Sequence, residues 1–391
     1  MSEAVQRETQ RNALLRRALV TRFTIEDVLI VPVIAVVMAL ILGGITMLAT
    51  GVDLFTIERA FAALFTGSVG STYALSETLT AATPLTLAGL GIALGFRAGL
   101  FNIGAEGQLL MGGMAAVVVG FSFAGMPGFI HLPLALIAGA LVGAIWASIA
   151  GWLRAATGAH EVITTIMLNL ISFRLIDYLL RSPFIQRPGR ADPISQSVLE
   201  SATLPKLLLW LDPNLRLHAG LFVMLAAVVL IYWLLFRTTL GFEFRSAGAN
   251  PDAARYAGMR SGFLIVAVMA IAGALAGLAG ANQVLGVLGR ASPNFSAGIG
   301  FDAIAVALLG RGHPIGVLLA GLLFGALEAG GRQMQVSAGV SIDLISIIQA
   351  LIIVFIAAPL LVRTVFPWVF QRARRAPKGV TATQPTAEGG G

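Results

Sequence analysis

The chain has 391 residues, of which 57% are hydrophobic and 12% are charged, and its mean hydropathy is +0.87. About a quarter of the residues of a soluble domain are charged, because its surface lies in water. This composition therefore excludes an ordinary soluble protein. The sequence contains no cysteine, which excludes disulfides, thiolate metal sites and cysteine nucleophiles. A net charge of +7 fits basic residues on the loops of a membrane protein better than a nucleic acid partner.

The apolar residues form blocks of about 20, the length that a helix needs to cross a bilayer. They predict an all-α membrane protein, a polytopic bundle of about ten transmembrane helices. The transmembrane domain covers 28–362, between a basic tail at 1–27 and a polar tail at 363–391. The first block is too long for a signal peptide and lacks a small-residue cleavage site, so we expect it to be retained. The expected spans are 28–50, 80–96, 103–123, 132–152, 161–181, 218–236, 262–284, 299–311, 315–331 and 342–362.

Lys and Arg are about twice as frequent on one set of connecting loops as on the other. Because cytoplasmic loops carry the excess of basic residues, this asymmetry predicts that both termini are cytoplasmic. The longest external loop is then 182–217, which is rich in proline, and the longest internal loop is 237–261.

Glycines lie four residues apart within several expected spans. Small residues allow helix backbones to approach closely in a membrane, where no hydrophobic force drives helices together. These glycines therefore predict a tightly packed bundle, and they indicate no substrate. The pairs are Gly91/Gly95, Gly139/Gly143, Gly273/Gly277 and Gly321/Gly325.

The internal loop 237–261 contains the signals of a short capped helix. Asn250 is a favourable N-cap, Pro251 suits the first helical position, and Gly258 is a natural stop. Such a helix gains little lipid contact, so we expect a rigid surface element that fits a groove on another protein; a solvated loop helix is the alternative. The candidate residues of this element are Gly248, Asn250, Pro251, Asp252, Ala254, Arg255, Tyr256 and Gly258.

Segment 95–113 interrupts a long apolar run with polar residues and several glycines. Polar groups at membrane depth are costly unless they face protein or a wet cavity, and a glycine-rich break can build such a cavity. An ordinary cytoplasmic turn between two spans is the alternative. Two asparagines in other spans could line the same path or bond helix to helix. The candidate path residues are Asn102, Glu106, Gln108, Asn169 and Asn282.

Five blocks of the sequence, in order, form a recognisable pattern. They are GFRAGLFNIGAEGQ at 95–108, AHEVITTIMLN at 159–169, GANPDAARYAG at 248–258, GFDAIAVALLGR at 300–311 and IDLISIIQ at 342–349. The pattern resembles the permease family of nucleoside and simple-sugar ABC importers, to which branched-chain amino acid and ribose-type inner-membrane permeases are related. The resemblance extends from about residue 84 to residue 355.

The resemblance implies a type II importer fold in a bacterial inner membrane, with 250–258 as the helix that couples the permease to ATP hydrolysis. It implies a second permease subunit, ATP-binding subunits that hold ATP and Mg²⁺, and an extracytoplasmic substrate-binding lipoprotein. No cofactor is then expected on this chain, and membrane lipid surrounds it. The implied solute is a nucleoside or a related sugar-containing compound.

The sequence contains no Gly-x-x-x-x-Gly-Lys-Ser/Thr loop, so we do not expect this chain to hydrolyse ATP. An ion-coupled secondary carrier is the alternative function, because it would share the composition and the broken helices. Such a carrier needs acidic residues at mid-membrane, and Glu106 is the main candidate. Glu77, Asp302 and Glu328 lie near the ends of expected spans. The four histidines are scattered without metal-ligand spacing, which gives no support to a membrane-embedded enzyme.

Overall fold

The computed structural model describes residues 25–341 and 343–357. The predicted tails, apart from residues 25–27, and the end of the last expected span lie outside the described residues. The longer helices are α2 (Ile25–Ala49), α3 (Leu54–Val69), α4 (Thr72–Arg97), α5 (Ala105–Ser122), α6 (Gly128–Thr157), α7 (Glu161–Leu180), α8 (Gly220–Arg237), α11 (Ser261–Asn282), α13 (Pro314–Ala338) and α14 (Asp343–Ala357). The shorter ones are η1 (Glu200–Ala202), α9 (Thr239–Ala249), α10 (Pro251–Tyr256), α12 (Ile299–Leu309) and the π-helix η2 (Gln283–Leu288).

Each of the ten expected spans coincides with a helix, and the all-α membrane fold is confirmed. Among the described residues, seven helices are long and apolar enough to cross a membrane. The accompanying shorter apolar stretches are Ile34–Ala49, Ile299–Leu309 and Asp343–Ile352.

The expected boundaries are wrong around α3 and α4. Helix α3 was not expected at all, and α4 begins at Thr72 rather than at residue 80. Polar residues lower the hydropathy of this region, yet their side chains are satisfied within the helices, by capping an end or by bonding to a carbonyl one turn earlier. Ser71 caps α4 by accepting a hydrogen bond from the backbone N–H of Ala74, and the Thr80 hydroxyl donates to the Ser76 carbonyl one turn earlier, at 2.7 Å.

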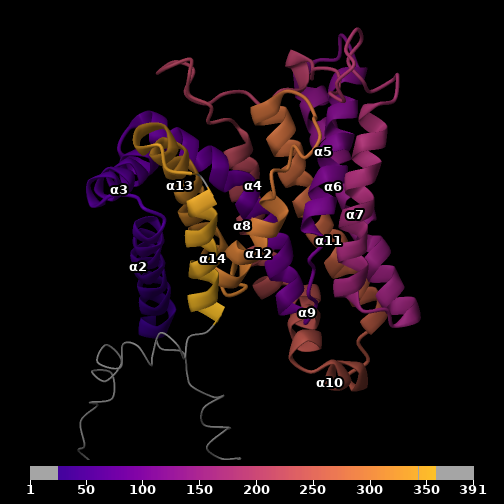
Figure 1. Ribbon diagram of the computed structural model, residues 1–391. Coiled ribbons are helices and arrows are strands. Elements are labelled where there is room, and N and C mark those ends of the chain that lie inside the picture. Colours follow the sequence, from indigo (N-terminus) through magenta and orange to yellow (C-terminus); the bar gives the residue numbers. More distant parts are fainter. Residues whose placement is uncertain (1–24, 342, 358–391) are drawn as a thin grey trace, which may run out of the picture.

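Helix α4 lies at the centre of the bundle, and most of its residues are buried. It packs against α11 on one side and against α13 on the other. In Figure 1, α5, α6, α7 and α11 form a group on the right, whereas α2, α3, α13 and α14 lie on the left. The chain therefore places two groups of helices around one central helix.

The predicted role of glycine in packing is confirmed where α6 crosses α11. A Cβ atom added to Gly143 would lie 2.3 Å from the carbonyl oxygen of Gly273, and one added to Gly277 would lie 2.2 Å from the carbonyl oxygen of Gly139. Only glycine allows backbones to approach this closely. The α6–α11 pair is consequently joined through its main chains.

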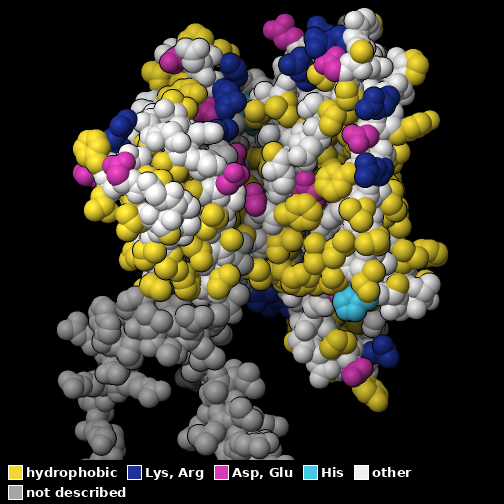
Figure 2. Space-filling model, viewed as in Figure 1, with side chains coloured by type: hydrophobic (Ala, Val, Ile, Leu, Met, Phe, Trp, Pro, Cys, Tyr) yellow, Lys and Arg dark blue, Asp and Glu magenta, His cyan; other side chains and the backbone are white. Residues whose placement is uncertain are grey.

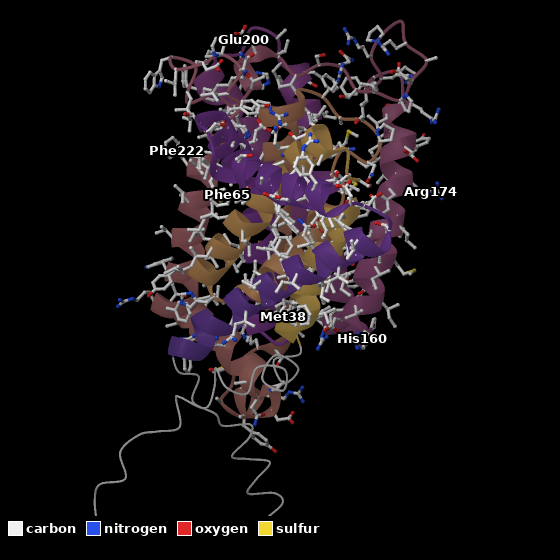
Figure 3. All side chains as sticks on the ribbon, turned by 60° about the vertical axis from the view of Figure 1, so that its left-hand side comes forward. Met38, Phe65, His160, Arg174, Glu200 and Phe222 are labelled. Carbon is white, nitrogen blue, oxygen red and sulfur yellow. The ribbon has the colours of Figure 1, made fainter. Side chains whose placement is uncertain are left out.

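The outer surface carries the large apolar side chains. On α6, Ile137, Leu141 and Ile145 are exposed, while Gly139 and Gly143 between them are buried against the bundle. Phe222 on α8 points away from the bundle in Figure 3. Figure 2 shows apolar side chains covering the lower part of the visible face, with basic and acidic side chains gathered at the upper end. This distribution is that of a protein whose solvent is lipid.

The bundle has two distinct ends. Helix α10 projects from one end, where α2 begins and α14 finishes (Figure 1). The loop 182–217 covers the opposite end; Figure 3 labels Glu200 there and His160 at the α10 end. Below, these are called the α10 end and the loop end.

Candidate functional site

The short helix α10 projects beyond the bundle on the end of α9 (Figure 1). The Asn250 side chain accepts a hydrogen bond from the backbone N–H of Ala253 at 3.0 Å, so it caps the helix as expected. Gly258 follows with a φ of +84°, which is the left-handed conformation that ends many helices. The rest of α10 is exposed except Ala254, and Tyr256 at its tip is 94% exposed.

The α9–α10 segment rests on the turn that follows α4 through direct backbone contact. A Cβ atom added to Gly248, near the end of α9, would lie 2.2 Å from the carbonyl oxygen of Arg97. Gly99 has a φ of +71°, and a Cβ added there would lie 3.2 Å from the Gly248 Cα. No side chain separates the two segments at this contact.

An ion pair holds the same turn from the other side. Arg154 of α6 pairs with Glu161 at the start of α7, and the Glu161 carboxylate also accepts a hydrogen bond from the backbone N–H of Phe101 at 3.3 Å. A cavity of about 150 Å³ lies beside this pair, with Gly99, Gly248 and Arg154 in its wall. The turn after α4 is thus clamped between α9 and the α6–α7 connection.

The polar residues of the predicted break bond mainly to one another. Asn102 and Gln108 exchange two side-chain hydrogen bonds, at 3.0 and 3.1 Å, and Asn102 also accepts from the backbone N–H of Gly104. Asn169 of α7 accepts from the N–H of Gly107 and donates to the carbonyl of Ile103, both at 2.9 Å. These three side chains are buried, and they satisfy the backbone groups that the break leaves without helical partners.

Glu106 connects the break to the start of α12. Its carboxylate accepts hydrogen bonds from the Ser296 hydroxyl and, at 2.7 Å, from the backbone N–H of Gly300. Gly300 lies in the first turn of α12, where N–H groups lack helical acceptors and the helix dipole favours a negative charge. A Cβ at Gly300 would lie 2.4 Å from the Glu106 Cα. Glu106 therefore caps another helix from inside the bundle.

Asn282, the last residue of α11, differs from the other candidates. It is buried, and neither its amide oxygen nor its amide nitrogen has a hydrogen-bond partner among the described residues. His218 lies beside it, and the Nε2 atom of His218 is likewise without a partner there. The π-helix η2 begins directly after Asn282, and such helices are frequent at functional sites.

The structure therefore brings Asn102, Gln108 and Asn169 into one polar cluster, while Glu106, in the same break, bonds to the start of α12. Asn282 lies apart near the loop end. The sequence did not indicate the partners Ser296, Gly300, Arg154 and Glu161. A charged pair at the facing ends of α6 and α7 is the one signal that could have suggested the last two. The described residues contain no cluster of histidine, aspartate and glutamate able to hold a metal ion.

The chain is similar to known transport proteins over most of its length. The family model for the permease component of branched-chain amino acid transport systems matches residues 74–357. The guanosine ABC transporter permease protein of Bacillus subtilis is 41% identical over 339 residues, which are 86% of this chain and 95% of that protein. The matched range contains both the polar break and α10. No solved structure matches the chain.

Two further relatives differ in their named solutes. The glucose ABC transporter permease protein of Haloferax volcanii is 41% identical over 332 residues, 83% of this chain and 86% of that protein. The nucleoside ABC transporter permease protein of Lactococcus lactis subsp. cremoris is 37% identical over 342 residues, 86% of this chain and 93% of that protein. Similarity of this extent covers nearly whole proteins and is not confined to one motif.

Proposed function

This chain belongs to the family of branched-chain amino acid transport system permease components, and on that premise we propose that it forms the membrane path of an ATP-driven importer for nucleosides or a related sugar-containing solute. The observation that carries the proposal is the exposed, capped helix α10, which follows α9 at the point where the Gly248 backbone packs directly on the turn after α4. An exposed helix held in this way is suited to binding by another protein.

The proposed partner of α10 is a separate ATP-binding subunit, which carries ATP and Mg²⁺. The full sequence of this chain has no phosphate-binding Gly-x-x-x-x-Gly-Lys-Ser/Thr loop. A second permease subunit and an extracytoplasmic substrate-binding lipoprotein complete the proposed assembly in the bacterial inner membrane. The α10 end is then cytoplasmic, and the excess of Lys and Arg that the sequence assigns to this side comes from the two tails, which lie outside the described residues. The proposal puts both termini on the cytoplasmic side as well.

In the proposed mechanism, closure of the ATP-binding subunits displaces α10, and the bundle alternates between two conformations. The ATPase can shift this equilibrium only through contacts with α10 that differ between its open and closed states. The displacement passes from Gly248 to Gly99 by backbone contact, and onward to the cluster around Asn102. Glu106, in the same break, bonds to the start of α12.

The five candidate path residues fall into two groups, according to whether their polar atoms already have hydrogen-bond partners within the chain. Asn102, Glu106, Gln108 and Asn169 use their polar atoms within the chain, so we assign them to holding the break beside the path. Asn282 keeps both polar atoms unpaired among the described residues, so we place it on the path. A nucleoside or sugar presents neutral donors and acceptors, which an amide can match.

The test is a comparison of Tyr256→Ala with Tyr178→Ala in tagged protein purified from native membranes. Both tyrosines are exposed, but Tyr178 lies on α7, away from α10. We expect the wild type and Tyr178→Ala to co-purify with an ATP-binding protein, and Tyr256→Ala to lose most of it together with guanosine uptake. Equal recovery and uptake for both variants would contradict the assignment of α10. Uptake that stops when the proton gradient is collapsed at constant ATP would instead indicate the ion-coupled carrier.

A further inference from the structure

A polar cavity of about 430 Å³ lies at the loop end, away from α10 and from the break. Its walls come from the end of α3, the start of α4, the last turns of α13 and one residue of the loop 182–217. The volume falls in the range of small-molecule sites, roughly 300–1,000 Å³. Gly67, Gly70 and Ala74 line it on the α3–α4 side. Small residues at these positions leave space that larger side chains would fill.

Charged side chains form one wall of this cavity. Glu77 of α4 is buried and accepts hydrogen bonds from two nitrogens of Arg216, one of them Nε at 2.8 Å. The Nη2 atom of Arg332 lies 3.9 Å from the Glu77 carboxylate and 3.7 Å from the Glu328 carboxylate. Two arginines thus face two glutamates. A network that is already balanced disfavours a charged ligand, because an added charge would lack a counter-charge.

The free donors and acceptors of the network suit a neutral ligand with several hydroxyl groups. The side chain of Arg332 is 41% exposed, and its ion pairs with Glu77 and Glu328, at 3.9 and 3.7 Å, are long; it makes no hydrogen bond within the part of the chain that the structure describes, which leaves N–H groups available. Gln333, beside it, also lines the cavity; its Nε2 atom donates one hydrogen bond to the Ser337 hydroxyl at 3.0 Å and keeps a second N–H for a ligand. Tyr73 adds an exposed aromatic ring. The guanidinium group of an arginine presents its N–H donors in a fixed, planar arrangement. Beside an aromatic ring, these donors form a surface on which a sugar can bind by hydrogen bonds to its hydroxyls and by apolar contact with its ring.

Resting on the proposed function, we propose that this cavity is where the permease first receives its solute from the outside, binding the sugar ring of a neutral nucleoside or monosaccharide. Arg332 and Gln333 donate to ring hydroxyls, and Tyr73 contacts the ring. Arg216 holds Glu77 in place and belongs to the wall. The site lies on the side that faces the substrate-binding protein in the proposed topology.

The experiment uses the complete importer reconstituted in proteoliposomes, with guanosine and D-glucose as probes and the binding protein at saturation. We expect Arg332→Gln and Tyr73→Leu each to lower uptake about tenfold, which corresponds to a loss of about 1.4 kcal/mol of binding, while ATP hydrolysis stays within about twofold of the wild type. Arg187→Gln is the matched control, because Arg187 is an exposed arginine of the same end outside the cavity. It should transport like the wild type.

Competition between guanosine and an analogue without the ribose ring hydroxyls tests whether the cavity binds the sugar ring. If the cavity binds the sugar ring, 2′,3′-dideoxyguanosine should compete with guanosine poorly, and Arg332→Gln should reduce the difference between the two. Uptake by Arg332→Gln equal to that of Arg187→Gln would overturn the inference. So would a variant that only raises the concentration of binding protein needed for half-maximal ATP hydrolysis, since that marks a protein-docking surface. No uptake of either probe by the wild type would instead overturn the proposed function.

Discussion

The carboxylate of Glu106 on α5 accepts a hydrogen bond from the backbone N–H of Gly300 in the first turn of α12, although 194 residues separate them. The Ser296 hydroxyl donates to the same carboxylate. The start of a short helix inside the bundle is therefore capped by a side chain from another helix. Loss of this cap leaves buried donors without acceptors, and each costs about 1–3 kcal/mol.

Replacement of Ser296 by alanine tests that cap with the smallest change. The variant leaves the Glu106 carboxylate with one fewer donor in a buried site, so we expect a lower melting temperature in detergent, corresponding to about 1–3 kcal/mol. Ser292→Ala in the same connecting segment is the control, because Ser292 is only half-buried. Equal melting temperatures for the two variants would show that the Ser296 bond adds nothing to stability.

Asn169 and Asn282 are both buried, but the Asn169 amide is hydrogen-bonded and the Asn282 amide has no partner among the described residues. Asn169→Leu removes the partners of the Gly107 N–H and the Ile103 carbonyl, so we expect it to destabilise the protein by roughly 2–5 kcal/mol. Asn282→Leu removes an amide that has no partner among the described residues, so its melting temperature should change little. If Asn282 lies on the path, uptake by Asn282→Leu falls although the fold is intact. Normal uptake by this variant would remove Asn282 from the path.

The sequence predicted α10 well because all of its determinants are local. An N-cap, a proline at the first position and a glycine stop lie within nine residues, and each acts on its own backbone. The membrane spans could be predicted equally well, since hydropathy is a property of consecutive residues. Helix α3 was not, because Glu58 and Arg59 interrupt its apolar pattern and its 16 residues are too few to cross a bilayer upright.

The partners of the polar residues could not be predicted from one sequence. Glu77 appeared to be an ordinary residue near a span end, but α4 begins earlier than expected, which buries Glu77 opposite Arg216. Glu106 was expected on the substrate path because it is acidic and lies in a glycine-rich segment. Which donors reach its carboxylate depends on how α12 packs on α5, and no local signal encodes that contact.

The environment of His218 predicts a stability that depends on pH. His218 lies in the loop before α8; burial lowers the pKa of its imidazole to about 4, and the nearby Arg216 acts in the same direction. Its Nδ1 atom accepts a hydrogen bond from the backbone N–H of Gly220, which protonation of that atom would break. The unfolded chain binds this proton near pH 6.5 and the folded chain only near pH 4, so stability falls as the pH drops through this window.

The measurement is the melting temperature of the wild type and of His218→Gln at pH 8 and pH 5. Between these values the His218 contribution should fall by roughly 2 kcal/mol in the wild type. Glutamine keeps an acceptor for the Gly220 N–H but does not titrate, so the variant should lose less stability on acidification. A loss of the same size in both proteins would assign the pH dependence to other groups.

Gly258 provides the sharpest test of the α10 geometry, because a side chain there would meet no neighbouring atom but would strain the backbone. A Cβ added at Gly258 would contact nothing within 4 Å, yet the φ of +84° is strained for any other residue and most of all for a β-branched one. Gly258→Val should therefore shift the end of α10 without disturbing the core. Gly262→Val is the control, since Gly262 is also exposed and lies at the start of α11 without a positive φ.

We expect Gly258→Val to keep a wild-type melting temperature but to lose most ATP-driven uptake, while ATP hydrolysis by the assembled importer continues at its basal rate. This combination follows if α10 transmits motion and the bundle does not depend on it for stability. Gly262→Val should transport normally. Full uptake by Gly258→Val at normal expression would mean that the position of the α10 terminus is irrelevant to coupling, and the backbone contact between Gly248 and residues 97–99 would then have only a structural role.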